Sequence, residues 1–189
     1  ESCARVVATG GTAKPQDDGS FVVTGANRLL LFVDLRMLYD PDKSVLEEMK
    51  HSLARLPADY GRLLDEHAKL HGQLFNRMRL DLGGGADHQR TTEELLELST
   101  YENPNRALIE KEFDAARYNI ISCTGELPPT LQGVWGGTYV PGWASDFTHN
   151  GNVPSAIASY LMGNMPELMP AYTSYIESIV PYLEINARH

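Results

Sequence analysis

The chain has 189 residues, of which 42% are hydrophobic and 22% are charged, a composition that supports a buried core and argues against disorder. Its 16 basic and 25 acidic side chains give a net charge of -9. This excludes a nucleic acid as the expected partner, because phosphate binding needs a basic surface. The longest apolar run, residues 29–33, is too short to span a membrane. The chain opens on Glu1 without a methionine or a targeting segment, so we expect it to be part of a longer protein.

The first forty residues predict three short strands, over residues 5–8, 21–24 and 29–35, because each is an aliphatic or β-branched run. Glycine and aspartate residues between these runs are typical of hairpin turns. Three short strands do not make a sheet with a covered face, so we expect the end of a larger sheet.

Two cysteines, Cys3 and Cys123, allow a single disulfide and match no spacing of metal ligands. The alternative, which we favour, is a pair of buried free thiols that behave as small hydrophobic groups.

Two helices are predicted next. The apolar residues of 45–53 follow helical spacing up to Pro57, and a second helix begins near Asp59. His67 and His71 lie four residues apart on the apolar stripe of the second helix. The spacing suits a metal pair, but the glutamate of a metalloprotease helix is missing between them, so we favour packing histidines.

Residues 77–82 alternate between polar and apolar side chains, which predicts one half-buried strand. The three glycines at 83–85 lack the pattern of a phosphate-binding loop, and we interpret them as a turn.

The remaining helices are predicted from 3.6-residue periodicity. The first is capped by Thr91 or Thr92, the second begins at Asn105 and ends by Gly125, and Pro181 should kink the last turn of the fourth. The four helices are expected over residues 92–98, 105–124, 154–162 and 167–183.

A long irregular stretch over residues 131–152 contains both tryptophans. Loops of this length in a folded domain are usually functional. Aromatic faces and side-chain amides suit a neutral, hydroxyl-rich ligand such as a carbohydrate; the alternative is that the tryptophans are packing anchors and the asparagines form turns. The residues that carry this composition are Gln132, Trp135, Tyr139, Trp143, Asp146, His149, Asn150 and Asn152.

Several segments of the chain resemble one enzyme family in order and spacing. Residues 122–135, SCTGELPPTLQGVW, resemble the segment SRPGxLPANLQGIW of the family 95 glycoside hydrolases, the inverting α-L-fucosidases and their L-galactosidase relatives. Residues 141–146 are similar to PPWGSDY of that family, and 147–152 fall where it has YxxNIN. Residues 74–82 resemble LFxRVxLDLG, and 105–121 resemble the helix that follows it, so the resemblance runs from about residue 70 to 183.

The resemblance implies an α+β architecture in three parts. Residues 1–39 would be the C-terminal strands of a β-sandwich. Residues 40–100 would be a helical linker with one returning strand, and residues 101–189 the first helices of an (α/α)6 toroid.

The resemblance also implies a mechanism. The family cleaves by inversion, with a general acid, and a base that activates water on the opposite face of the sugar. Asn150 and Asn152 match the two asparagines that hold this water, and the carboxylates would come from later in the protein, so we expect this chain alone to be inactive. The implied partners are an oligosaccharide and the rest of the parent chain, with no metal, no cofactor and no membrane, in an extracellular or periplasmic location. The remaining site residues would contact the sugar (Trp135, Trp143, Thr148, His149) or orient the loop (Gln132, Asp146).

The chain departs from the family pattern at two places. Gly151 replaces the isoleucine between the asparagines, which loosens the backbone there. Residues 155–160 replace the family's MNYWPA, so a tryptophan wall is lost. One interpretation of these changes is that the enzyme prefers a different sugar. The alternatives are a non-catalytic carbohydrate-binding or structural helical module derived from this family, and a helical protein-interaction unit.

Overall fold

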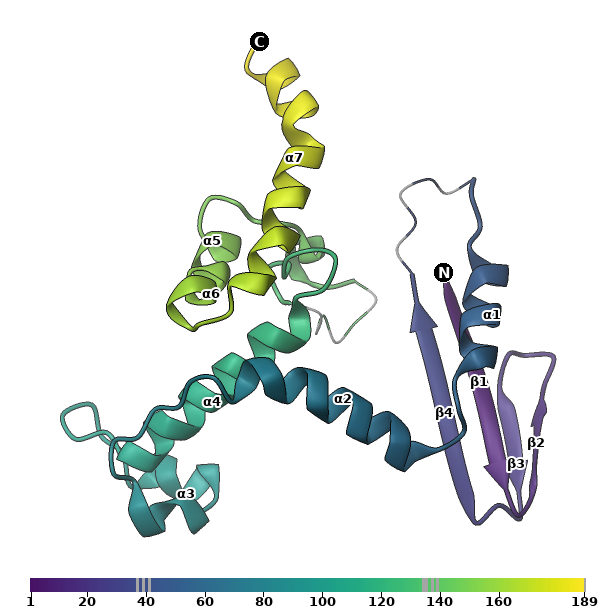
Figure 1. Ribbon diagram of the computed structural model, residues 1–189, viewed down its shortest axis with the longest axis horizontal. Helices are drawn as coiled ribbons and strands as arrows, with labels where there is room; N and C mark the ends of the chain where they lie inside the picture. The colour runs from purple at the N-terminus through teal and green to yellow at the C-terminus, as the bar shows by residue number, and fades with distance from the viewer. Residues whose placement is uncertain are drawn as a thin grey trace. The chain divides into compact units, whose positions relative to one another are not determined.

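The computed structural model describes residues 1–188 except 37, 39, 41, 134, 135, 137 and 139 (Figure 1). It is of the α+β class, and its contacts divide into two units, Glu1–Ala68 and Lys69–His189. The division falls inside the helix α2 (Tyr60–Phe75) and within the predicted linker at 40–100. No helix among the described residues is long and apolar enough to cross a membrane.

Two antiparallel sheets of two strands each form the β part of the first unit. Strand β1 (Ser2–Thr9) pairs with β4 (Arg28–Leu35), and β2 (Thr12–Pro15) pairs with β3 (Phe21–Thr24). The three predicted strands are confirmed, but β2 was missed, because its sequence TAKP has little β propensity and ends in proline. Gly10, at a φ of 79°, makes the turn between β1 and β2.

Helix α1 (Leu46–Arg55) covers one face of the β1–β4 sheet through its buried Met49 and Leu53. The Arg5 guanidinium donates to the carbonyl oxygens of Leu53 at 2.7 Å and Leu56 at 2.8 Å. These carbonyls end α1 and carry partial negative charge, so a cation from β1 fixes the helix to the sheet. Leu56 ends the helix next to Pro57, as predicted.

The second unit begins with the end of α2 and continues through two capped helices. Helix α3 (Thr92–Glu97) starts with a capping box between Thr91 and Glu94. Helix α4 (Arg106–Cys123) starts at Asn105, whose side chain accepts from the Leu108 N–H at 3.3 Å. Both starts confirm the sequence prediction.

The strand predicted over residues 77–82 is wrong. The structure gives this segment a turn followed by irregular backbone, because no described strand lies beside it to complete a ladder. Instead the buried Glu110 carboxylate accepts from the Leu82 N–H, from the Gly84 N–H at 3.2 Å and from His88. Gly83 and Gly84 lie in irregular backbone, with Gly83 at a φ of 79°, and Gly85 begins the short 3-10 helix η1 (Gly85–Gln89).

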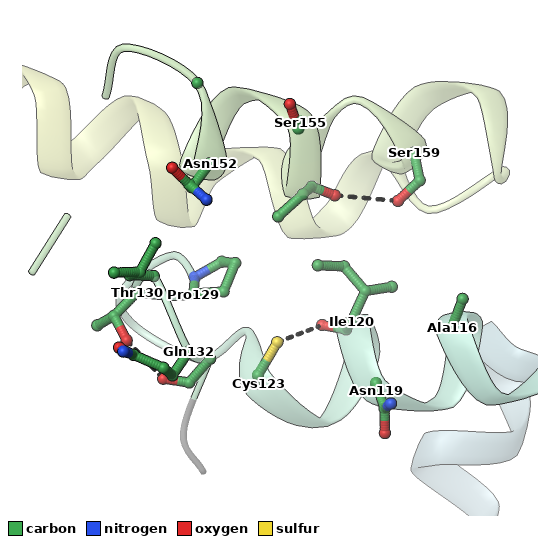
Figure 2. Close-up of a pocket in the computed structure, with 14 residues that line it drawn as sticks. Ala116, Asn119, Ile120, Cys123, Pro129, Thr130, Gln132, Asn152, Ser155 and Ser159 are labelled. Atoms are coloured by element: carbon green, nitrogen blue, oxygen red, sulfur yellow. Dashed lines mark hydrogen bonds between the residues drawn. The ribbon is translucent and has the colours of Figure 1, made fainter. Parts of the chain in front are cut away.

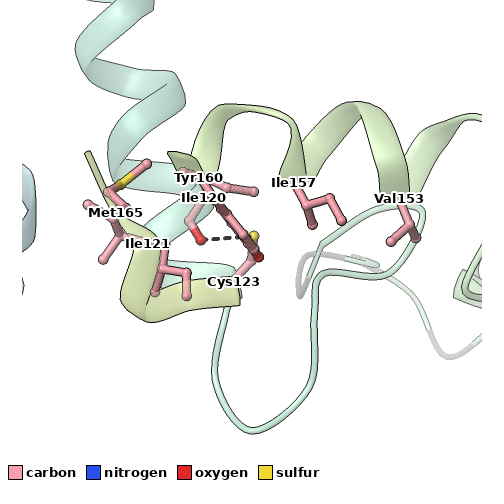
Figure 3. Packing of buried hydrophobic residues seen from close by; sticks show 8 residues of the cluster. Ile120, Ile121, Cys123, Val153, Ile157, Tyr160 and Met165 are labelled. Atoms are coloured by element: carbon pink, nitrogen blue, oxygen red, sulfur yellow. Dashed lines mark hydrogen bonds between the residues drawn. The ribbon is translucent and has the colours of Figure 1, made fainter. Parts of the chain in front are cut away.

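The C-terminal helices form the main core with α4 (Figure 3). The predicted helix at 154–162 is two short helices, α5 (Asn152–Ile157) and α6 (Ser159–Met162). The last helix, α7 (Met169–Asn186), follows a 3-10 turn at Pro166–Leu168 and contains Pro181. The buried members of the core are Ile120, Ile121, Cys123, Val153, Ile157, Tyr160, Met165 and Leu168.

Arg117 of α4 ties three segments of the second unit together. Its side chain is only 4% exposed, and its guanidinium donates to the carbonyls of Gly163 at 2.7 Å, Leu74 at 2.8 Å and Phe75 at 3.2 Å. Burial lowers the pKa of this group. The end of α2 and the turn after α6 are therefore both fixed to α4 by one cation.

Replacing Arg117 by Lys should lower the free energy of unfolding by about 1–3 kcal/mol, because an ammonium cannot reach all three carbonyls and leaves a buried acceptor unpaired. Chemical denaturation measures the change. Arg106→Lys is the matched control, since Arg106 lies on the same helix but is exposed. Equal stability of the two variants would contradict the role given to Arg117.

Replacing Glu110 by Gln should make the second unit less sensitive to acid. The pKa of Glu110 is lowered from its ordinary value of 4.5 by the Leu82 N–H first, and also by Gly84 and His88, against the effect of burial. A lowered folded pKa contributes stability that is present above the ordinary value and is lost as the pH falls through the folded value.

Thermal midpoints measured from neutral pH down to below 4.5 should therefore fall more for the wild type than for Glu110→Gln. Glu112→Gln, an exposed change on the same helix, should keep the wild-type acid response. If Glu110→Gln keeps it too, the proposed linkage is wrong.

Candidate functional site

A cavity of about 740 Å³ lies within the second unit, between α4, the loop that follows it, and the α5–α6 segment (Figure 2). One wall comes from the second half of α4 and another from α5 and α6. The lining residues are Ala116, Asn119, Ile120, Cys123, Pro129, Thr130, Leu131, Gln132, Gly133, Gly151, Asn152, Ser155, Ala156 and Ser159.

The lining combines polar and apolar side chains, and none of the described residues in it is charged. Three residues bring amides and three bring hydroxyls, and burial raises the pKa of the Cys123 thiol, which keeps it neutral. A charged ligand would lose its hydration without gaining a counter-charge, whereas a neutral ligand with hydroxyl groups can exchange hydrogen bonds with amides. The cavity therefore suits a neutral, hydroxyl-rich molecule.

Gln132 joins the cavity to the loop beyond it. Its Nε2 donates to the Gly142 carbonyl at 2.7 Å. Its Oε1 is buried and has no hydrogen-bond partner among the described residues. Beside it, the Thr130 hydroxyl donates to the Gly133 carbonyl at 2.6 Å, and Gly133 adopts a φ of 65°, so this part of the wall is a tight turn.

Asp146 holds the two ends of the irregular stretch together. Its backbone carbonyl accepts from the Leu131 N–H at 2.9 Å, and its carboxylate accepts from the Thr148 hydroxyl. Between them, Trp143 lies in a short turn, η2 (Gly142–Ser145), and is 82% exposed. Neither Asp146 nor Trp143 lines the cavity.

Aromatic side chains of α7 hold the segment before the two asparagines. The Tyr175 ring lies 4.4 Å from the Phe147 ring and 5.3 Å from the His149 ring, centroid to centroid. His149 also approaches Tyr172 at 6.1 Å, and its two ring nitrogens are buried without a partner among the described residues. His149 and Thr148 are thus packed in the loop and are not part of the cavity lining.

The two asparagines of the predicted water-holding pair differ in their exposure to the cavity. Asn152 is the first residue of α5 and lines the cavity, and its side chain points toward the loop with Thr130 and Gln132 (Figure 2). Asn150 is exposed and does not line the cavity. Of the predicted site residues, the structure brings Gln132 and Asn152 to the cavity, and Trp135 lies outside the described residues, as does Tyr139.

The α4 wall was missed by the sequence analysis, as were Ser155 and Ser159. Ala116, Asn119 and Cys123 recur at helical spacing beside the buried stripe of α4, and a polar Asn119 at the edge of that stripe was the available signal.

The other candidates for chemistry have structural roles. Cys3 and Cys123 are free thiols in the structure; Cys123 is buried as expected, whereas Cys3 is partly exposed, so the expectation of two buried thiols is wrong for Cys3. The His71 ring lies 4.9 Å from the Tyr118 ring and 5.8 Å from the Phe75 ring, the packing role that we favoured. Among the residues that the structure describes, no group of three or more His, Cys, Asp or Glu side chains is placed to hold a metal ion.

Replacing Tyr175 by Leu should loosen the segment that leads to Asn150 and Asn152, because the ring contacts with Phe147 and His149 are lost. Hydrogen exchange of the amides of residues 147–151 should become faster. Tyr182→Leu is the matched control, since Tyr182 lies on the same helix and is 67% exposed. The same protection in both variants would show that α7 does not hold the loop.

Comparison with known proteins gives the family. The sequence profile of the "Glycosyl hydrolase family 95 catalytic domain" matches residues 59–189. The chain is 36% identical over 131 residues to the "Probable alpha-fucosidase A" of Aspergillus niger, which covers 65% of this chain and 16% of that protein. It is 31% identical over 135 residues to the protein of the same name from Aspergillus oryzae, which covers 68% and 18%. The match thus spans less than a fifth of either relative. The chain belongs to glycoside hydrolase family 95.

Proposed function

We propose that the protein containing this chain is a glycoside hydrolase that removes a terminal α-L-fucose-like residue from an oligosaccharide. The observation that carries the proposal is the family match over the segment that holds Asn150 and Asn152. Two relatives are named as probable α-fucosidases, and the uncharged cavity beside Asn152 suits a neutral sugar.

The proposed reaction is a single displacement with inversion, in which Asn150 and Asn152 hold the attacking water. A side-chain amide can accept from water and donate to it, but it is too weak a base to deprotonate it. The pair therefore positions the water, and a carboxylate must polarise it while a second carboxyl group protonates the leaving oxygen. No carboxylate lines the described cavity, so we expect both groups from other parts of the protein, and this chain alone should be inactive.

The loop residues complete the proposed site. Trp143, with its ring exposed, is available to stack on a sugar face, and we assign the same role to Trp135. Thr148 and His149 are proposed to contact the sugar at the edge of the loop, after the small movement that frees them from Asp146 and Tyr175. Gln132 and Asp146 orient the loop through the hydrogen bonds described above.

The proposed architecture of the whole protein follows the family. We propose that residues 1–39 end a β-sandwich, that 40–100 form a linker, and that 101–189 begin an (α/α)6 toroid. An oligosaccharide substrate outside the cell fits an extracellular or periplasmic location.

A non-catalytic carbohydrate-binding module is the second candidate. Two observations favour it: the described cavity has no carboxylate, and Gly151 lines it between the two asparagines. Such a module would bind L-fucose and hydrolyse no fucoside, whereas the enzyme does both.

Replacing both Asn150 and Asn152 by Ala in the full-length protein should lower kcat on a fucosyl oligosaccharide on the order of 10²-fold or more, because the attacking water is no longer positioned. Asn103→Ala, an exposed change in the same unit, is the matched control. Unchanged hydrolysis by the double variant would falsify the assignment of the pair. Proton NMR of the wild-type reaction should show the β-anomer of fucose first, since a single displacement inverts the configuration.

A further inference from the structure

A second, smaller cavity of about 260 Å³ lies in the second unit, and we call it the apolar cavity. It is formed by α4, by α6 with the turn that follows it, and by Met78. Its lining includes Phe113 and three methionines, Met78, Met162 and Met165. Methionine side chains are unbranched and flexible, so a wall of this kind adapts to apolar ligands of different shapes.

The polar side chains in this lining are already engaged. Arg117 lines the cavity, but its two terminal nitrogens donate to the three carbonyls described above, and its Nε is buried. The Ser159 hydroxyl donates to the Ala156 carbonyl at 3.2 Å. A polar ligand would lose its hydration here without finding free partners, whereas an apolar group gains by leaving water. A cavity of about 150 Å³ can hold a molecule the size of benzene, so this one has room for an aromatic ring or a short alkyl chain.

The apolar cavity has an exposed edge and a buried floor. Met162 and Met78 are 77% and 40% exposed, whereas Met165 and Ile120 are 1% and 9% exposed. A ligand can therefore enter past the two exposed methionines and bury its apolar surface against the other two side chains.

The apolar cavity adjoins the larger cavity, because Ala116, Ile120 and Ser159 line both. In the larger cavity, Ala116 and Ser159 lie at the end away from Asn152 (Figure 2). In the proposed single displacement, the water attacks one face of the sugar and the leaving group departs from the opposite face. A sugar whose reacting carbon faces Asn152 therefore directs its leaving group toward the shared residues and the apolar cavity.

We propose that the apolar cavity binds the leaving group of a second class of substrate, the α-L-fucosides of apolar alcohols that carry an alkyl chain or an aromatic ring. The water oxygen bonds to the anomeric carbon while the bond from that carbon to the glycosidic oxygen breaks. The alcohol leaves with a proton from the carboxyl group that the rest of the protein supplies. The proposal rests on the proposed fucosidase function and adds to it the chemistry of the leaving group.

Thioglycoside inhibitors test the proposal in the full-length protein, because a sulfur in place of the glycosidic oxygen resists hydrolysis. The inhibition constants of methyl and butyl 1-thio-α-L-fucoside are measured against hydrolysis of a fucosyl oligosaccharide. Each methylene group that leaves water strengthens binding about three- to four-fold. The butyl compound should therefore inhibit the wild type about ten-fold or more better than the methyl compound.

Variants at the exposed edge locate the butyl chain. Met162→Gln and Met78→Gln keep a similar shape but introduce an amide, which the chain would have to strip of water. Each should lower the preference for the butyl compound about three-fold or more. Leu161→Gln is the matched control and should keep the wild-type preference, since Leu161 lies on the same helix as Met162, is 63% exposed and lines neither cavity.

The outcomes separate this inference from the proposed function. If the wild type hydrolyses fucosides but both compounds inhibit it equally, another part of the protein fills the apolar cavity and only this inference is wrong. It is also wrong if the preference for the butyl compound is the same in all three variants, because the chain then binds elsewhere. If the wild type neither hydrolyses fucosides nor is inhibited by either compound, the proposed function fails and the inference fails with it.

Discussion

One buried cation organises the second unit of this chain. The Arg117 guanidinium donates to three backbone carbonyls, two at the end of α2 and one in the turn at Gly163. The carbonyls at the end of a helix carry partial negative charge, which offsets part of the cost of burying the cation. Since Ala116 and Ile120 on the same helix line the cavity, the bonds that fix α4 also fix one wall of the candidate site.

The opposite wall is held by hydrogen bonds between segments that are irregular in themselves. The Asp146 carbonyl accepts from the Leu131 N–H, and the Gln132 side chain donates to the Gly142 carbonyl. The segment at 147–149 packs on the Tyr175 ring of α7. A loop without regular structure can hold its side chains in fixed positions only when such contacts replace the backbone hydrogen bonds of a helix or sheet. The position of Asn152 is fixed from both sides, because this residue ends the loop and also begins α5, next to the buried Val153.

Sequence patterns predicted the elements whose signals are local. The caps at Thr91 and Asn105 lie where a side-chain oxygen precedes an apolar period, and Pro57 marks the end of α1. The failures share a different cause. The segment 77–82 has the alternation of a strand, but alternation cannot supply the neighbouring strand that would pair with it. In its place Glu110, distant in sequence, takes the free N–H groups.

The candidate site divides in the same way. The motifs around Gln132, Asp146, Asn150 and Asn152, together with the segments at 74–82 and 105–121, identified the family from sequence, because their order and spacing can be read along the chain. The α4 wall, the free state of both cysteines, the packing of His149 on α7 and the unpaired Oε1 of Gln132 were decided only by the tertiary structure. Each of these depends on which distant atoms come within a few ångströms of a side chain. A local pattern fixes the residue type and its helical or extended setting, and packing then decides whether its polar atoms are satisfied, buried or left for a ligand.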